Sequence, residues 1–465
     1  MIARSATGLL LALLCAASGA AALEVNLPKH ERVELANGTV VILSEKHDVP
    51  LIGLEAIVRG GAVTDPENLG GLASLLARVL QHGAGKRDAA AFAEAVESVG
   101  GALDVSADLE ALRISADFMS RDAELMIELV ADMLQRPALA EEELDKLRMR
   151  SINLIKAAKG GNPGRLLPNY GNAFLFGEHA YGNPVGGSET TLAAITHEDL
   201  LQYYNDFVGG DRLIISVVGD FNAEAMKARL TEVFGGWRAA ASPLAALAAA
   251  NKISGRSVLL VDAPGATQTY FWIGNLGVAI DYPARAELNL ANTVFGGRFT
   301  SMLNTELRVK AGLTYGARST IQQPSLPGAV VISSFTETST TVDAIDLALE
   351  VLETFRDDGL DDEMMLSARN YIMGQFPPRL ETAPQIASQL AMLEQYGLNA
   401  SFIDNYGSAL EGASQDSVAA VIAEVYPSAD NLSFILIGDA ASIREAVSKY
   451  GPITEISINE PRFRP

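Results

Sequence analysis

The chain contains the same run of secondary-structure signals twice, about half a chain length apart. Residues 195–235 predict a helix, a strand that stops at Gly219-Asp220 and a second helix, and residues 413–451 predict the same order with a stop at Gly438-Asp439. Repetition of a whole α/β unit restricts the chain to folds built from two similar domains. With 465 residues, each half is long enough to bury a core of its own.

Helix caps and apolar spacing predict the elements within each half. Thr196 and Ser414 stand where a helix N-cap is expected, and Asn37-Gly38 between two β-rich runs predicts a hairpin. Strands joined mostly by hairpins and packed against helices indicate an α+β fold, in which two homologous domains each consist of an antiparallel sheet and helices. In the first half we expect a strand at residues 51–60 and helices at residues 70–82, 87–100, 120–135 and 141–159, the first of them with one buried stripe.

Residues 238–252 separate the two halves. This segment is rich in Ala, is interrupted by Pro243 and lacks the periodicity of a core element. Such a composition is typical of an exposed linker. We therefore predict an N-terminal domain at residues 23–237 and a C-terminal domain at residues 253–465.

The first 22 residues have the composition of a signal peptide. Arg4 precedes an apolar stretch from Gly8 to Ala17, and the small residues Ala20 and Ala22 occupy the positions that signal peptidase recognises. We expect cleavage after Ala22 and export to the periplasm, with full secretion as the alternative. Every later apolar run is shorter than the roughly 18 residues that a membrane span needs, so no span is expected.

Cys15 is the only cysteine, and it lies inside the predicted signal peptide. The mature chain is therefore expected to have no disulfide and no catalytic thiol. A lipid anchor on Cys15 is an alternative location signal. Leu13 and Leu14 precede Cys15 where lipid attachment sites usually have small residues, so plain export is favoured.

Acidic residues outnumber basic ones along the chain. Asp and Glu total 57 and Lys and Arg total 35, which gives a formal net charge of −22. This balance disfavours nucleic acid as a partner, because affinity for nucleic acid comes largely from Lys and Arg contacts to phosphate. It also raises the hypothesis that the chain attracts basic peptides, although a net charge does not show where acidic side chains gather.

Five segments in a fixed order carry a resemblance to a known family. They are LANGTVVILSEKHDVP, GGAVTDPENLGGLASLLARVLQHG, RDAAAFAEAVESVGG, GEHAYGNPVGG and, in the second half, VFGGRFTSMLNTELRVKAGLTYGARS. In order and spacing they resemble the pitrilysin/insulinase (M16) family of zinc metallopeptidases, in the form whose subunits carry two homologous α/β domains. The resemblance extends over nearly the whole chain after the predicted signal peptide and implies a peptidase M16-like clam-shell half.

Active members of that family carry an inverted zinc motif, His-x-x-Glu-His, in the helix after the Gly pair. Two imidazoles on one helical face can share a metal ion, and the Glu polarises the bound water. In this chain the three positions hold Ser74, Ala77 and Arg78, and the region expected to hold the distal Glu ligand, residues 153–156, contains no acid. We therefore predict no metal ion in this chain. The five histidines form no i, i+4 pair and no short ligand cluster: they are His30, His47, His82, His179 and His197.

The resemblance also implies a role for Arg308 and Tyr315 in the segment LRVKAGLTYG. They stand at the positions of the family's Arg/Tyr pair, which holds substrate carbonyl or carboxylate oxygens opposite the zinc. A guanidinium and a phenol are directional donors that can stabilise an oxyanion. The alternative is that Arg308 is a last-turn helix cation and Tyr315 is half-buried sheet packing. The intact frame around them favours the pair, although Met302 replaces an expected basic residue.

These features predict a non-catalytic, substrate-binding subunit of an exported heterodimeric zinc endopeptidase, inactive alone. A homologous partner bearing His-x-x-Glu-His would hold the zinc, and Arg308 and Tyr315 would complete its site in trans on an extended peptide. The alternative is a pseudoenzyme that binds peptides or serves in assembly without proteolysis. A free-standing hydrolase that uses Ser74 is disfavoured, because the chain has no Gly-x-Ser-x-Gly elbow.

Overall fold

The computed structural model describes residues 26–251 and 253–465 and contains two six-stranded sheets of the same design. The first sheet has the order β1-β2-β8-β3-β7-β6 and the second has the order β14-β9-β13-β10-β12-β11. The first comprises β1 (Glu31–Glu34), β2 (Val40–Glu45), β3 (Leu51–Arg59), β6 (Ala102–Ala107), β7 (Ala111–Met119) and β8 (Leu213–Gly219). The second comprises β9 (Ser257–Asp262), β10 (Gln268–Leu276), β11 (Arg318–Ile321), β12 (Ala329–Glu337), β13 (Ser433–Gly438) and β14 (Ile453–Ser457). The predicted signal peptide, Cys15 included, lies outside the described residues.

The α+β architecture with two similar sheets is confirmed, but neither sheet is antiparallel throughout. Strand β2 pairs parallel with β8, and β9 pairs parallel with both β13 and β14. The other principal pairs are antiparallel, including β3 with β7 and β10 with β12. The prediction of antiparallel sheets followed from the hairpins. It missed the pairs between strands that lie far apart in the sequence.

Several helices begin at a residue whose side chain caps them, among them α7 and α16. The predicted N-caps are confirmed at Thr196 and Ser414, each with a capping box that ties the side chain to the backbone three residues on. The helices are α1 (Leu72–Leu80), α2 (Ala89–Glu97), α3 (Ala123–Gln135), α4 (Glu141–Gly161), α5 (Leu167–Phe176), α6 (Glu189–Ala194), α7 (His197–Phe207), α8 (Ala223–Phe234), α9 (Arg285–Asn292), α10 (Met302–Asn304), α11 (Thr341–Asp358), α12 (Asp362–Gln375), α13 (Ala383–Gln395), α14 (Ser401–Asp404), α15 (Tyr406–Gly412), α16 (Gln415–Val425) and α17 (Ala440–Val447).

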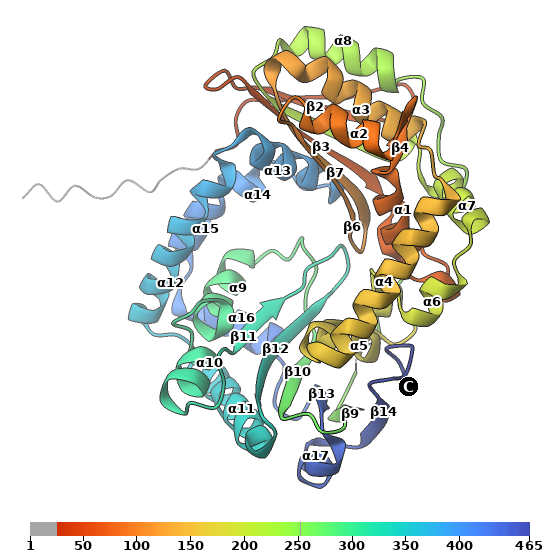
Figure 1. Cartoon of the computed structure of the whole chain (residues 1–465). Coiled ribbons are helices and arrows are strands. Elements are labelled where there is room, and N and C mark those ends of the chain that lie inside the picture. The colour runs from red at the N-terminus through yellow and green to blue at the C-terminus, as the bar shows by residue number, and fades with distance from the viewer. Residues whose placement is uncertain (1–25, 252) are drawn as a thin grey trace, which may run out of the picture.

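Each half sends one helix onto the sheet of the other half. Helix α5, from the first half, packs against β10 and β13, and helix α13, from the second half, packs against β3 and β8. Figure 1 shows the sheets at opposite ends of the molecule, with α13 lying under the first and α5 over the second. The exchange makes the apolar cores of the two halves interdependent.

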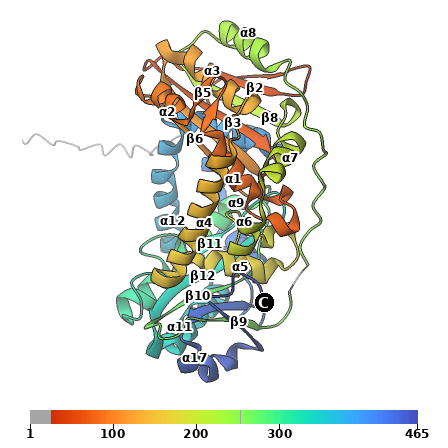
Figure 2. The ribbon, with the colours of Figure 1, turned by 45° about the vertical axis from the view of Figure 1, so that its right-hand side comes forward.

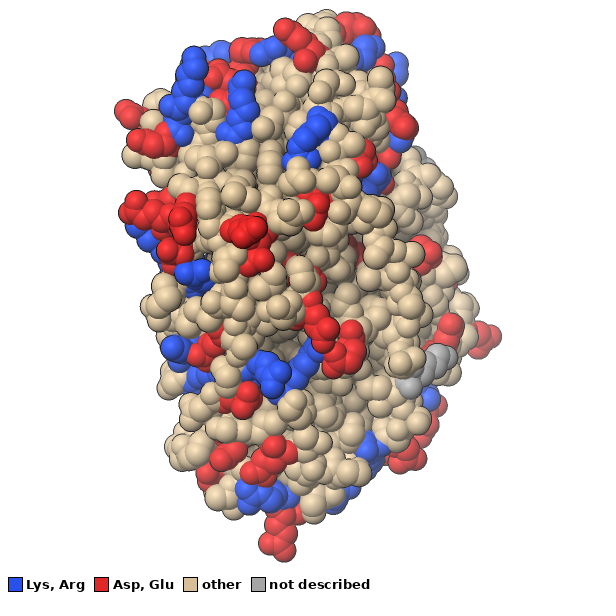
Figure 3. All heavy atoms as spheres, turned by 90° about the vertical axis from the view of Figure 1, so that its right-hand side faces the viewer, with Lys and Arg blue, Asp and Glu red and all other residues tan. Residues whose placement is uncertain are grey.

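Helix α4 runs along the long axis between the two ends, and the chain between the halves follows the outside of the molecule (Figure 2). That segment is not exposed along its whole length as predicted. Leu247 and Ala250 pack half-buried against the core that includes α5 and the second sheet. On the face drawn in Figure 3, blue and red side chains lie among one another without a broad basic area. Among the described residues, no helix is both long and apolar enough to cross a membrane.

Candidate functional site

Helix α1 carries the three residues at the predicted zinc-motif positions. Gly71, with φ at 97°, precedes the helix, and the Asp65 carboxylate caps it by accepting hydrogen bonds from the backbone N–H groups of Gly71 at 2.7 Å and Ala73 at 2.8 Å. The helix is buried on nearly all sides, whereas one buried stripe was predicted. Only Ser74 and Arg78, one turn apart, reach a partly open face.

Arg78 occupies the space between α1 and α4. Its Nη1 donates to Ser151 Oγ at 2.8 Å, and Ser151 Oγ in turn donates to the Leu147 carbonyl at 2.8 Å. Burial, and to a smaller extent repulsion from Arg150, lower the pKa of Arg78. Among the described residues no carboxylate forms an ion pair with Arg78. The position that would hold a dication therefore already holds a cation.

The residues at this position do not fit a zinc ion. Ser74 offers only a neutral hydroxyl and Ala77 a methyl group, and α4 contributes the Ser151 hydroxyl to this face instead of a carboxylate. His82, just after the helix, has its Nδ1 2.8 Å from the Arg78 carbonyl and its Nε2 3.9 Å from a Glu143 carboxylate oxygen. In the part of the chain that the structure describes, no three His, Cys, Asp or Glu side chains are grouped to hold a metal ion.

Arg308 lies in the second half, in a wide π-helical turn, Thr305–Lys310, that continues α10. Wide turns of this kind are frequent at functional sites. Leu307 beside it is fully buried and anchors the turn. The Arg308 guanidinium lies 4.7 Å from the centre of the Phe299 ring, in a cation–π contact, and no ion pair or hydrogen bond within the described residues engages it. Its N–H donors remain available to a ligand.

Tyr315 lies in a loop that strand β12 holds in place. Ser334 Oγ donates to the Gly316 carbonyl at 2.9 Å, and Thr336 Oγ1 donates to the Leu313 carbonyl at 2.7 Å. The Tyr315 ring stacks 6.5 Å from the Phe335 ring, and the residue is 79% exposed. The alternative that Tyr315 is half-buried sheet packing is therefore wrong.

The structure brings Arg308 and Tyr315 together in one cavity of about 580 Å³. Ser74, Ala77 and Arg78 do not line it. The cavity presents a guanidinium and a phenol, both of which donate hydrogen bonds, beside the backbone of the loop between them. This pair can bind an oxygen of a carbonyl or carboxylate group. The lining residues are Gln268, Arg308, Gly312, Leu313, Thr314, Tyr315, Phe335, Thr336, Glu337 and Thr340.

Asn304 positions both sides of this cavity and was missed by the sequence analysis. Its Nδ2 donates to the Phe299 carbonyl at 2.6 Å, and its Oδ1 accepts from the Ala317 backbone N–H at 3.3 Å. It thereby ties the residue beneath Arg308 to the loop that carries Tyr315. The sequence did contain a signal for Asn304. It is a polar residue next to the apolar Leu303 and at helical spacing from the apolar Leu307.

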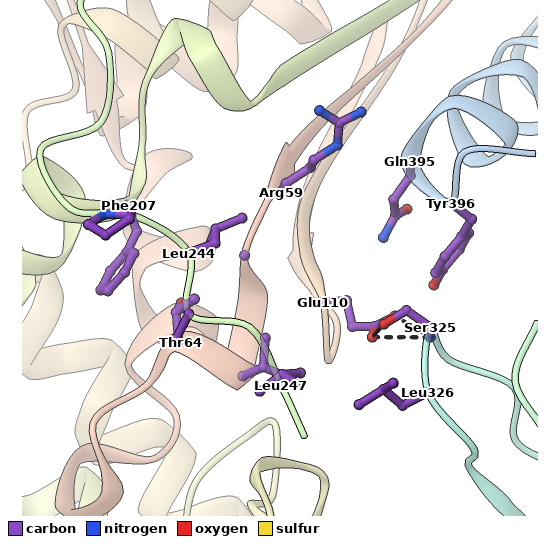
Figure 4. Close-up of a pocket in the computed structure, with 14 residues that line it drawn as sticks. Arg59, Thr64, Glu110, Phe207, Leu244, Leu247, Ser325, Leu326, Gln395 and Tyr396 are labelled. Carbon is purple, nitrogen blue, oxygen red and sulfur yellow. Dashed lines mark hydrogen bonds between the residues drawn. The ribbon is translucent and has the colours of Figure 1, made fainter. Parts of the chain in front are cut away.

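A second cavity, of about 470 Å³, lies where the two halves and the segment between them meet. Figure 4 shows Glu110 facing Ser325 in its wall, with Gln395 and Tyr396 approaching from the α13 side. The Glu110 carboxylate accepts from the Ser325 backbone N–H at 3.1 Å and from the Tyr181 hydroxyl at 2.6 Å. Burial, and then the hydrogen bond to Glu110, raise the pKa of Tyr181 to about 12. The hydrogen bond between Glu110 and Ser325 connects the two halves of the chain.

The fold and the degenerate helix together define a class of protein: a two-domain α+β chain in which the zinc-motif positions of helix α1 hold no metal ligand. Residues 40–187 match the family model described as insulinase, peptidase family M16, and residues 194–372 match the model described as peptidase M16 inactive domain. The chain belongs to peptidase family M16, as its sequence resemblance predicted.

Curated relatives extend this similarity over most of the chain. The chain is 25% identical to an uncharacterized zinc protease of Mycobacterium leprae, over 79% of this chain and 82% of the relative. It is 23% identical to a protein of Helicobacter pylori named non-peptidase homolog YmxG, over 80% of this chain and 85% of the relative. One of these two relatives is thus named a zinc protease and the other a non-peptidase.

Solved structures share the fold over nearly their whole length. The structure described as the peptidase M16 inactive domain from Pseudomonas fluorescens is similar with a TM-score of 0.82 and 22% identity, over 88% of this chain and 98% of that chain. A protease from Helicobacter pylori is similar with a TM-score of 0.81 and 17% identity, over 89% of this chain and 100% of that chain. At these identities the similarity establishes the fold.

Proposed function

We propose that this chain is the non-catalytic, substrate-binding subunit of an exported heterodimeric zinc endopeptidase. The observation that carries the proposal is the contrast between two places in the molecule. Arg308 and Tyr315 line one cavity and offer free donors, whereas Ser74, Ala77 and Arg78 cannot hold a metal ion. A chain that retains substrate-holding donors without a metal site needs a second chain to complete a peptidase.

In the proposed complex, a homologous partner that bears His-x-x-Glu-His holds the zinc and the general base. The Arg308 guanidinium and the Tyr315 phenol then bind the substrate carbonyl and stabilise the oxyanion that develops on it. Strand β11 is the edge of the second sheet and follows Tyr315 closely, so an extended peptide can add to that edge by backbone hydrogen bonds. The sequence expectation of a signal peptide makes the periplasm the proposed location.

The test is reconstitution with the partner. The native complex is purified, and a co-purifying chain that carries His-x-x-Glu-His is sought by mass spectrometry. In the reconstituted pair, Arg308→Ala and Tyr315→Phe should each lower turnover about 10²- to 10³-fold, because each removes one oxyanion donor. Lys310→Ala is the matched control, since Lys310 lies in the same turn, is paired with Glu306 at 2.7 Å and does not line the cavity.

Zinc content of the complex should be unchanged in all three variants. Full peptidase activity in both cavity variants would refute the role in trans.

The relative named non-peptidase homolog favours a second candidate function, that of a pseudoenzyme that binds peptides or assembles with other proteins without proteolysis. Purification of a homodimer, with no homologous metal-binding chain, would support that candidate.

A further inference from the structure

We propose that the groove next to the Arg308/Tyr315 cavity selects acidic peptide segments that also carry aromatic side chains. This inference rests on the proposed peptide-holding function and names the substrate class. It concerns a further cavity, of about 630 Å³, that shares Gln268, Tyr315 and Phe335 with the Arg308/Tyr315 cavity. The two cavities therefore form one continuous surface, called here the sheet groove.

The sheet groove exists because α5 covers only part of the second sheet. Helix α5 packs on β10 and β13 and leaves one face of β11 and β12 open beside it. The register places Arg318 opposite Ser333, and Ser333 opposite Trp272, on this face. Since side chains on a strand alternate between faces, Thr320 continues the same face. The groove thus crosses three strands and ends at a sheet edge.

The first half of the chain contributes one wall of the sheet groove. Gly164 lies so close to Tyr270 that a Cβ there would be 2.4 Å from the Tyr270 ring. This packing fixes the turn Pro163–Leu166 against the sheet and places Arg165 in the lining of the groove. The turn Pro163–Leu166 is therefore part of the wall of a cavity.

The charges in the sheet groove have the opposite sign to the chain. Arg165 and Arg318 line its larger cavity, whose lining contains no Asp or Glu, and Arg308 lines the smaller one, where Glu337 is the single acid. None of these three arginines forms an ion pair within the described residues, although the chain has a net charge of −22. Unpaired guanidinium groups bind carboxylates strongly, often through two hydrogen bonds. The hypothesis that basic peptides are favoured, drawn from net charge, is not supported here.

Three aromatic rings of the sheet groove lie in series. The Tyr270 and Phe335 rings are 5.7 Å apart, and the Phe335 and Tyr315 rings are 6.5 Å apart. Trp272 also borders the same cavity but is buried, so the rings available to a ligand are those of Tyr270, Phe335 and Tyr315. Exposed faces of aromatic rings bind other aromatic side chains, in offset or edge-to-face contacts. The combination of guanidinium groups and aromatic rings suits a peptide that alternates carboxylate and aromatic side chains.

The experiment measures peptide binding to the mature chain alone by fluorescence anisotropy. Three dye-labelled peptides of about ten residues, the length of an extended strand of about 33 Å, share the same aromatic positions and carry Glu, Ser or Lys between them. The acidic peptide should bind about 10-fold or more tightly than the neutral one, and the basic peptide weakest. The preference should shrink as salt is raised from about 0.05 to about 0.5 M, because salt screens these charges.

The variant R165Q/R318Q should lose about 5-fold or more of the affinity for the acidic peptide and little of the affinity for the neutral one. R121Q/R462Q is the matched control, because the side chains of Arg121 and Arg462 are 73% and 61% exposed and line neither cavity. Equal binding of acidic and basic peptides, or an unchanged preference in R165Q/R318Q, would overturn the charge selection and leave peptide binding intact. Failure of all three peptides to bind would instead overturn the proposed peptide-holding function and this inference with it.

Discussion

At the scale of single residues, Arg78 illustrates how a metal position can be closed by a side chain. Its guanidinium is half-buried, has a lowered pKa and reaches only the Ser151 hydroxyl. A buried cation without a carboxylate partner costs folding free energy. Arg78 lies at the position where related peptidases would hold a dication. Ala77 stands at the position of the Glu that would act as the general base, and its methyl group cannot take a proton.

Restoring the motif should therefore not restore the metal. In the variant Ser74→His, Ala77→Glu, Arg78→His we expect less than one zinc per chain after dialysis, measured by elemental analysis. The reason is that Ser151 faces this position from α4 and supplies no third ligand or supporting carboxylate. Retention of a full equivalent of zinc would show that α1 alone determines the loss.

Asp65 is a buried carboxyl group whose titration should be visible in stability. Burial raises its pKa to about 7, against the opposing effect of hydrogen bonds from the backbone of Ala73 and Gly71. In the unfolded chain the pKa is about 4. Between these values the folded chain binds a proton more readily than the unfolded chain, so the contribution of Asp65 to stability falls as pH rises, by about 1 kcal/mol per pH unit.

Asp65→Asn should remove this slope from the free energy of urea unfolding measured between about pH 5 and pH 7. Asp430→Asn, at a side chain that is 97% exposed, controls for the loss of one surface carboxylate and should retain the slope. Identical slopes in the two variants would contradict the assignment to Asp65.

At the scale of elements, the sequence predicted local structure better than it predicted which strands pair and which helices pack on which sheet. Thr196 and Ser414 act as caps as predicted, because a cap depends on residues three positions away. The parallel pair of β9 with β13 joins strands that no hairpin connects. No helix was predicted at residues 167–176, and only the structure shows that α5 lies there and packs on the second sheet. The exposure of Tyr315 likewise depends on Thr336 and Ser334, which lie on another strand.

Two glycines allow α5 to reach the second sheet. A Cβ at Gly164 would lie 2.4 Å from the Tyr270 ring, and a Cβ at Gly171 would lie 2.8 Å from the Trp272 ring. We expect Gly164→Ala and Gly171→Ala each to lower the free energy of unfolding by about 1–3 kcal/mol, because the added methyl overpacks the interface. Denaturant unfolding measures this change.

Gly160→Ala is the matched control for both glycine variants. Gly160 lies in α4, and a Cβ there would meet nothing within 4 Å. Alanine is a better helix former than glycine, so this variant should be as stable as the wild type or more stable by up to about 1 kcal/mol. If all three variants behaved alike, close packing at Gly164 and Gly171 could not be the cause.

At the scale of the whole molecule, the exchange of α5 and α13 makes each half a part of the other's core. Helix α13 covers an apolar cluster on one face of the first sheet, and Gly53 lets it approach, because a Cβ there would lie 2.4 Å from the Pro384 backbone nitrogen. The Glu110–Ser325 contacts add a polar latch between the halves. The apolar residues of the first sheet in this cluster are Val40, Ile42, Ile57, Ala111, Ile214 and Val218.

Neither half should therefore fold alone, despite its own six-stranded sheet. Without α13, a fragment of residues 26–250 exposes this apolar cluster, and each large side chain in it contributes about 1.5–3 kcal/mol when buried. Five such side chains amount to about 10 kcal/mol, which is comparable to the whole stability of a typical domain, about 5–15 kcal/mol. We expect this fragment and the complementary fragment of residues 253–465 each to be rapidly digested by protease when expressed alone, and both to be protected when they are coexpressed.

The intact chain should unfold in one calorimetric transition. The variant Gly53→Val, which obstructs α13, should divide this transition into two or lower its midpoint temperature. Fragments that melt cooperatively by themselves would mean that the exchanged helices are additions to two complete domains instead of parts of one core.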